Sequence, residues 1–231
     1  MLNPAQNVAN KLWAASKIND LLRAQGTTQL VSPDQITESK LRRDTLLAAQ
    51  PGFQNIVFNK NAATSVNASE KLLNQNDAFL VTAIRLSAKK LTATATDALH
   101  VKAREFTYPN TFVFDGTTEV VDIFGLWNAT LQIYQNQKVQ FPAIWTGDLN
   151  FTPETVYGDI TGLITGPTYS RKIVDSKPTP NFGFYSIQPF LLMGTDNSYI
   201  NLNFGATLSI IESAEFNYFT ITLGGYLVSG S

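Results

Sequence analysis

From about residue 53 onward, the chain is a long series of short runs rich in β-branched and aromatic residues, broken by Gly, Pro, Asn and Asp. Runs of this kind, closely spaced and without helical patterns between them, predict antiparallel sheets packed as a sandwich rather than a parallel sheet with crossover helices. The predicted strands are 53–58, 78–87, 91–96, 99–106, 111–114, 118–124, 129–135, 139–145, 155–164, 181–193, 199–211 and 216–228.

The last of these runs is the most regular. In residues 216–228 both alternating faces are partly apolar, which is typical of a central strand or of a strand that meets another subunit. Gly224 and Gly225 interrupt it, and their place inside an apolar strand predicts a bulge or a close backbone contact. Turn-forming residues such as Asp115-Gly116 and 194–197 separate many of the strands.

The N-terminal part has a different period. Asn3-Pro4 is a typical helix start, and Gly26 is a typical residue just past a helix end. Between them an apolar stripe recurs at helical spacing, so we predict a helix over 4–24. The stripe consists of Val8, Leu12, Ala15, Ile18 and Leu22, widened by Trp13 and Leu21.

A second helix is predicted over 33–49. Ser32-Pro33-Asp34-Gln35 has the pattern of a capping box, and Pro51-Gly52 would end the segment. The fold class predicted from all these patterns is therefore mainly β: an antiparallel β-sandwich, expected to be a single jelly roll, with an N-terminal helical arm. The expected division is a helical arm at 1–52 and a β-sandwich domain at 53–231.

Charge is distributed unevenly along the chain. Residues 1–105 contain 13 Lys and Arg against 8 Asp and Glu, whereas residues 106–231 contain 4 against 10, so +5 and −6 give the net charge of −1. The acids among the basic residues argue against a polybasic nucleic-acid tail. A solvated face is the commoner role of such charges, and an electrostatic contact with nucleic acid, a membrane or an acidic neighbouring subunit is the alternative.

Composition excludes several classes of site. The chain has no cysteine, which rules out disulfides, thiolate metal ligands and cysteine nucleophiles and favours synthesis in a reducing compartment. No secretory leader or membrane-spanning run is recognisable. Charged residues are only 15% of the chain, well below the usual quarter, and such a surface suits subunits that pack against copies of themselves.

No catalytic, cofactor-binding or metal-binding residue is assigned from the sequence, and we expect a protein that is not an enzyme. His100 is the only histidine, and no nucleophile motif surrounds it. The acids near Asp115 and near Asp148 fit turns and solvated faces better than a paired-carboxylate site. The segment 196–198 could supply oxygen ligands to calcium, although a turn is favoured. The glycines at 158–166 lack the ending of a phosphate-binding loop.

The aromatic residues leave two interpretations open. Trp127, Trp145 and the tyrosines could form a platform for sugars, but core packing is the commoner role of aromatic side chains in strands.

The arm at 4–49 and the strands at 78–87 and 181–228, in a chain rich in Asn and Thr, resemble capsid and other virion structural proteins of viruses, bacteriophages in particular. The resemblance concerns composition and the predicted secondary structure rather than a specific motif, and it therefore assigns no site residue. It implies self-assembly through the sandwich and the arm, other virion proteins as partners, and a virion made in the host cytoplasm. The chain is shorter than a double jelly-roll capsid protein, so both major and minor capsid roles stay open.

Two other functions are compatible with the residues. A secreted carbohydrate-binding or adhesion module would show an aromatic-lined groove. A β-sandwich hydrolase is disfavoured by the single histidine and the missing nucleophile motif.

Overall fold

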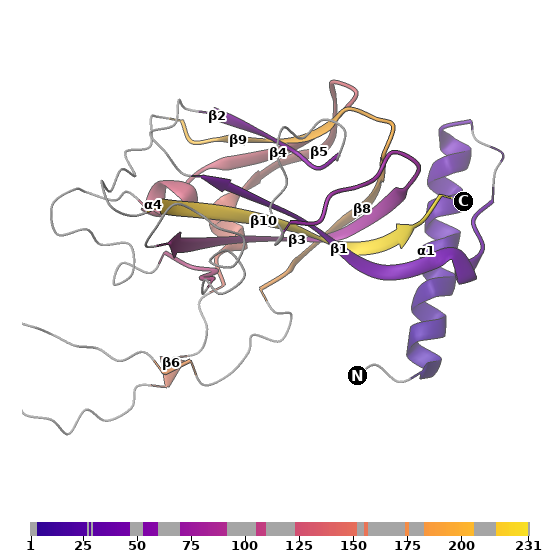
Figure 1. Ribbon diagram of the computed structural model, residues 1–231, viewed down its shortest axis with the longest axis horizontal. Coiled ribbons are helices and arrows are strands. Elements are labelled where there is room, and N and C mark those ends of the chain that lie inside the picture. The colour runs from indigo at the N-terminus through magenta and orange to yellow at the C-terminus, as the bar shows by residue number, and fades with distance from the viewer. Residues whose placement is uncertain are drawn as a thin grey trace, which may run out of the picture.

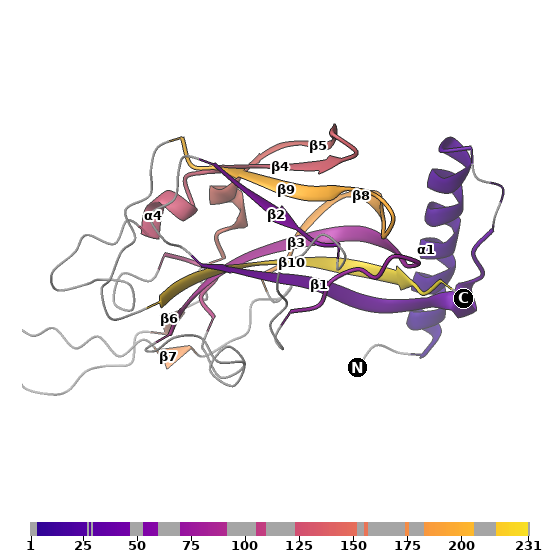
Figure 2. The ribbon, with the colours of Figure 1, turned by 45° about the horizontal axis from the view of Figure 1, so that its top comes forward.

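The computed structural model describes residues 4–26, 28, 30–46, 53–59, 70–91, 105–109, 123–151, 155–156, 174–175, 183–205 and 216–230. Two four-stranded antiparallel sheets lie one above the other, and one long helix crosses the end of the sandwich (Figures 1 and 2). The predicted class, an antiparallel β-sandwich with an N-terminal helix, is confirmed.

The elements follow one another in this order: α1 (Pro4–Ala24), the 3-10 turn η1 (Pro33–Gln35), β1 (Ile36–Leu46), β2 (Phe53–Val57), β3 (Ala78–Leu91), α4 (Ile123–Leu126), β4 (Thr130–Gln135), β5 (Lys138–Trp145), the 3-10 turn η3 (Thr146–Leu149), β6 (Thr155–Val156), β7 (Val174–Asp175), β8 (Tyr185–Met193), β9 (Ser198–Asn203) and β10 (Phe216–Val228).

The strand order identifies the sandwich as a jelly roll. One sheet has the order β1-β10-β3-β8 and the other β2-β9-β4-β5, while β6 and β7 form a separate small pair. Among the eight strands of the two large sheets, the first pairs with the last, the second with the seventh, the third with the sixth and the fourth with the fifth. This nested pairing is the rolled-up double Greek key of a jelly roll.

Two apolar clusters hold the fold together. The larger lies between the sheets and contains, among others, Phe79, Leu131 and Phe219. The smaller lies between α1 and the first sheet and includes Ile18 and Leu80. Because successive strand residues point to opposite faces, the continuous apolar run at the start of β3 serves both clusters.

The predicted helix at 4–24 is confirmed. Gly26 has a φ of +81°, the left-handed conformation expected of a residue just past a helix end, and its backbone N–H bonds to the carbonyl of Arg23 at 3.0 Å.

The second predicted helix is wrong. The capping residues are present, and the Ser32 N–H donates to Gln35 Oε1 at 3.0 Å, but they start only the single turn η1. Residues 36–46 instead form β1, whose eleven residues pair antiparallel with β10. The apolar residues of this segment are too sparse to bury a helix face, and the long ladder with β10 satisfies its backbone. The predicted arm at 1–52 is therefore helical at 4–24 and joins the sheet at 36–46.

Other strands match the prediction with shifted ends. The strand predicted at 78–87 continues to Leu91, and residues 216–228 form the central strand β10, between β1 and β3. The strand predicted at 118–124 is wrong at its end, because Ile123 begins the short helix α4. The predicted strands at 91–96, 99–106, 111–114 and 155–164 lie largely outside the described residues.

The predicted irregularity at Gly224 and Gly225 is confirmed, because the register between β10 and β3 shifts between them. A Cβ on Gly225 would lie 1.9 Å from the Leu80 carbonyl oxygen, whereas a Cβ on Gly224 would lie 3.2 Å from the Phe184 ring. Position 225 therefore admits no side chain unless the backbone of β3 moves.

We expect Gly225→Ala to lower the free energy of unfolding by about 1–3 kcal/mol, the usual cost of overpacking. Gly224→Ala is the matched control, because only a side chain opposes it and the ring can shift. Denaturant unfolding of both variants measures the difference, and equal stabilities would contradict the assignment of Gly225 as the close backbone contact.

Candidate functional site

The outer face of the first sheet divides into two halves, and α1 covers the apolar one. Near one end of the sheet, apolar side chains of four strands point away from the inter-sheet core and meet the helix. The strand residues in this contact are Ile36, Ala78, Leu80, Leu191 and Val228. The helix is thereby fixed crosswise on the sandwich, close to the C-terminus of the chain (Figure 1).

Only part of the helix stripe is used in this contact. Ala15, Ile18 and Leu22 are buried, whereas Val8 is 59% exposed and Leu12 is 55% exposed. These five residues form one stripe at helical spacing, so the apolar surface that meets the sheet continues towards the N-terminus without a cover in the described part of the chain. We call the segment from Pro4 to Leu12 the projecting half of α1; its nine residues extend over about 13 Å.

Trp13 lies where the helix leaves the sandwich. Its ring meets that of Tyr226 on β10 edge to face, with centroids 6.2 Å apart. Burial and the nearby Glu38 carboxylate raise the pKa of Tyr226 above its ordinary value. The hydroxyl therefore stays neutral to a higher pH in the folded protein than in the unfolded chain.

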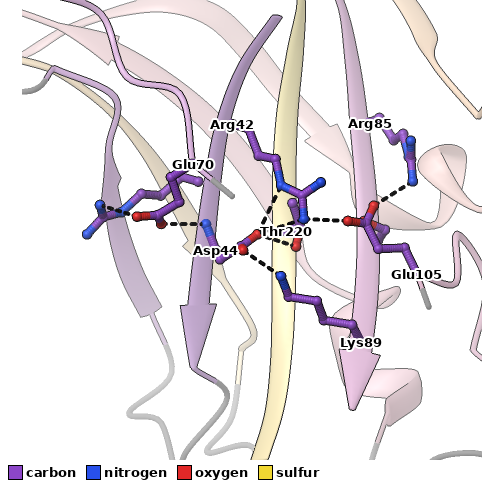
Figure 3. A network of polar contacts seen from close by, with 9 residues as sticks. Arg42, Asp44, Glu70, Arg85, Lys89, Glu105 and Thr220 are labelled. Atoms are coloured by element: carbon purple, nitrogen blue, oxygen red, sulfur yellow. Dashed lines mark hydrogen bonds and ion pairs between the residues drawn. The ribbon is translucent and has the colours of Figure 1, made fainter. Parts of the chain in front are cut away.

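The other half of the outer face is ionic. Lys89 on β3 and Asp44 on β1 are buried, and Nζ of Lys89 lies 2.5 Å from Oδ2 of Asp44. Thr220 on β10, the strand between them, donates its hydroxyl to Oδ1 of Asp44 at 2.7 Å. The contact thus ties together three neighbouring strands whose segments are far apart in sequence (Figure 3).

Arginines extend the network at both sides. Arg42 reaches Asp44 at 3.3 Å and also pairs with Glu105, whose other oxygen lies 2.7 Å from Arg85. Burial lowers the pKa of Arg85, and the Glu105 carboxylate opposes that shift.

On the side of β1 away from β10, where Lys71 forms a backbone bridge with Arg42, the neighbouring Glu70 carboxylate accepts from both a side chain and the backbone. Glu70 accepts from the Asp44 backbone N–H at 2.8 Å and from Arg43 at 3.2 Å. Charges buried with such partners are costly to separate, so the arrangement specifies the strand order more than it adds stability.

The structure bears differently on the two binding sites that the sequence left open, an aromatic platform for sugars and a calcium site at 196–198. Trp127 is buried in the core, as the commoner interpretation has it, whereas Trp145 on β5 is 52% exposed. The Asp196 carboxylate accepts bonds from Gln135 and Asn136, which ties the β8–β9 connection to the β4–β5 hairpin and favours a turn over a calcium ligand.

The remaining sequence-predicted candidates fall mostly outside the described residues, namely His100, Asp115 and the glycines at 158–166. Within the described ranges, no group of three or more His, Asp or Glu side chains could hold a metal ion. In that same part of the chain, no helix has the length and apolar character needed to cross a bilayer.

The sequence did not predict the ionic network, because its patterns place Arg42 and Asp44 in a helix and Lys89 on a solvated face. One signal was available: Arg85 and Ser87 share one face of the strand predicted at 78–87, and Lys89 continues that spacing two residues beyond its predicted end. The partner on β1 could not be found while that segment was predicted to be a helix.

We expect Lys89→Met to lower the free energy of unfolding by about 3–5 kcal/mol, because it leaves the buried Asp44 carboxylate without its nearest cation. Adding Asp44→Asn should restore part of the loss. Lys138→Met, at an exposed position in the β4–β5 hairpin, is the control with an expected change within about 0.5 kcal/mol. Equal effects of the two lysine variants in denaturant unfolding would refute a structural pair.

A second prediction concerns alkaline pH. Burial, followed by the Asp44 carboxylate, raises the pKa of Tyr218, as burial and Glu38 do for Tyr226. A pKa raised by folding gives stability that is present below the unfolded value of about 10 and is lost as pH rises through the folded value. We expect the Tyr218→Phe, Tyr226→Phe variant to lose less stability between about pH 8 and pH 11 than the wild type in denaturant unfolding. Identical losses would contradict the shifts.

The chain was compared with protein-family models, with curated proteins and with solved structures. None of the three comparisons finds a match.

Proposed function

We propose that this chain is a structural virion protein, a capsid subunit that assembles with copies of itself through its sandwich and its N-terminal helix. Its function is then mechanical rather than catalytic, its place is the virion, and other virion proteins are its further partners. The observation that carries the proposal is the apolar stripe of α1, which continues beyond the sandwich and is more than half exposed at Val8 and Leu12.

The projecting half of α1 has little reason to exist in an isolated monomer. A helical segment this short is marginal in water by itself and gains most of its stability from packing. The Val8 and Leu12 side chains are a little more than half exposed, so burying the rest of each against a partner would contribute about 1–2 kcal/mol. The same contact repeated around a symmetric assembly would add up over many copies.

A second copy of the chain suits the helix as a partner. Along α1, Lys11, Lys17 and Arg23 outnumber Asp20, whereas residues 106–231 carry 10 acids against 4 bases. A weakly basic helix with an apolar stripe therefore complements the acidic body of a neighbour. The low overall charge also reduces repulsion between packed copies. Nucleic acid or an anionic membrane would be a weaker, purely electrostatic alternative.

The architecture agrees with this function without being specific to it. Eight-stranded jelly rolls occur in viral capsid subunits, and also in lectin domains and cupins. Because fold alone does not identify function, the projecting helix is the stronger argument.

We expect Leu12→Asp to abolish oligomers of the wild-type protein, because a carboxylate replaces an apolar side chain in the middle of the proposed contact. Light scattering coupled to size-exclusion chromatography, with electron microscopy of the wild-type fractions, measures the assembly. The thermal unfolding of the monomer should change little, since Leu12 is exposed.

Asn10→Asp is the matched control, because it introduces the same charge into the same helix segment but on the nearly opposite face, two residues from Leu12. A wild-type protein that stays monomeric at high concentration would overturn the proposal. So would a Leu12→Asp variant with the same oligomers as Asn10→Asp. Removal of residues 1–50 is unsuitable as a test, because it would also remove β1.

A further inference from the structure

The four strands of the second sheet are nearly free of charge. Its four strands read FQNIV, SYINLN, TLQIYQ and KVQFPAIW, and Lys138 beside the hairpin turn is their single charged residue. By contrast, β1 and β3 of the first sheet contain eight charged residues, namely Glu38, Lys40, Arg42, Arg43, Asp44, Arg85, Lys89 and Lys90. The outer face of the second sheet is therefore suited to an uncharged ligand.

One end of this face presents a fixed aromatic ring. The Trp145 side chain is 52% exposed, and its indole N–H donates to Oδ1 of Asn128 at 3.3 Å. The ring also lies against the backbone at Gly147, where an added Cβ would come within 2.5 Å of ring atoms. Thr146 anchors the strand end, because its hydroxyl accepts from the Ala129 N–H at 2.9 Å. The indole is thus held at the surface before any ligand arrives.

The other end presents a pair of tyrosines. Tyr134 on β4 and Tyr199 on β9 face each other across the ladder with nearly parallel rings, 5.0 Å between centroids. Thr130 is the cross-strand partner of Trp145 and lies four residues before Tyr134, so the two aromatic positions are roughly 13 Å apart along the strand.

Amide side chains occupy the space between these aromatic positions. Gln132, Asn201 and Asn55 lie side by side on β4, β9 and β2. Asn201 donates to Asn55 at 2.8 Å, and Gln132 accepts from the Tyr134 hydroxyl at 2.9 Å. Each amide keeps further donors or acceptors that these bonds do not use.

We propose that this face binds a neutral oligosaccharide. Pyranose rings offer apolar C–H faces that pack on aromatic rings, and hydroxyls that both donate and accept. Amides match the hydroxyls, since an amide also does both, whereas the absence of charge gives no advantage to sialylated or sulfated sugars. The ends of the face supply the ring contacts and the middle supplies the hydrogen bonds. This site is independent of the assembly proposed above.

The test is an array of neutral glycans printed beside their sialylated and sulfated counterparts, followed by calorimetric titration with the neutral glycan that binds best. We expect binding to neutral glycans that falls about tenfold or more in Trp145→Ala and several-fold in Gln132→Ala. Trp13→Ala is the matched control, because it removes the other exposed tryptophan, on α1, and should bind like the wild type. Circular dichroism checks that each variant is folded.

Three results would overturn the inference: an array without binding to neutral glycans, binding limited to charged glycans, or equal affinities for Trp145→Ala and Trp13→Ala. An uncharged face could instead bind a second copy of the chain, and light scattering on the same samples detects such self-association. A Trp145→Ala variant that loses oligomers while neutral glycans do not bind would assign the face to subunit contact. Failure of glycan binding leaves the Leu12→Asp test of assembly unaffected.

Discussion

The pairing of β10 with β1 on one side and β3 on the other is the constraint on which the rest of the structure depends. It joins the last strand to a segment about 180 residues earlier in the chain, through an eleven-residue ladder, and so closes the jelly roll. The inner residues of β10, such as Phe219 and Ile221, enter the inter-sheet core. Its outward-facing residues contribute to both halves of the outer face of the first sheet, Val228 to the apolar half and Thr220 to the ionic half. The close approach at Gly225 allows this central strand to lie against β3 along its full length.

The outer face of the first sheet shows how one sheet can satisfy two different environments. At one end Leu80 and Val228 are covered by α1, and at the other Asp44 and Lys89 are buried as an ion pair with Thr220 between them. Apolar burial supplies most of the stability at the first end. At the second end a shifted register would leave a buried charge unpaired, and that penalty opposes incorrect strand pairing.

The two proposals use different surfaces of one rigid scaffold. Assembly is assigned to the projecting half of α1, where an apolar stripe leaves the sandwich. Glycan binding is assigned to the uncharged face on the second sheet, where Trp145 and the tyrosine pair flank a band of amides. A particle displaying many copies of a weak glycan site would bind a glycosylated surface through the sum of its contacts.

Local chemistry alone determined the helix at 4–24 and most strands of the body, because the spacing of apolar residues and the turn residues between them are properties of short segments. The alternation in residues 216–228 even indicated a central strand. Tertiary structure decided the segment at 36–46, whose capping residues favour a helix locally but whose backbone pairs with β10 from the far end of the chain. It also decided the ionic network, since the distance between Asp44 and Lys89 depends on the strand order. For the same reason, only the fold could show that Trp127 is buried while Trp145 is exposed. Contacts between distant segments follow from how strands pair, and a single sequence records that pairing only weakly.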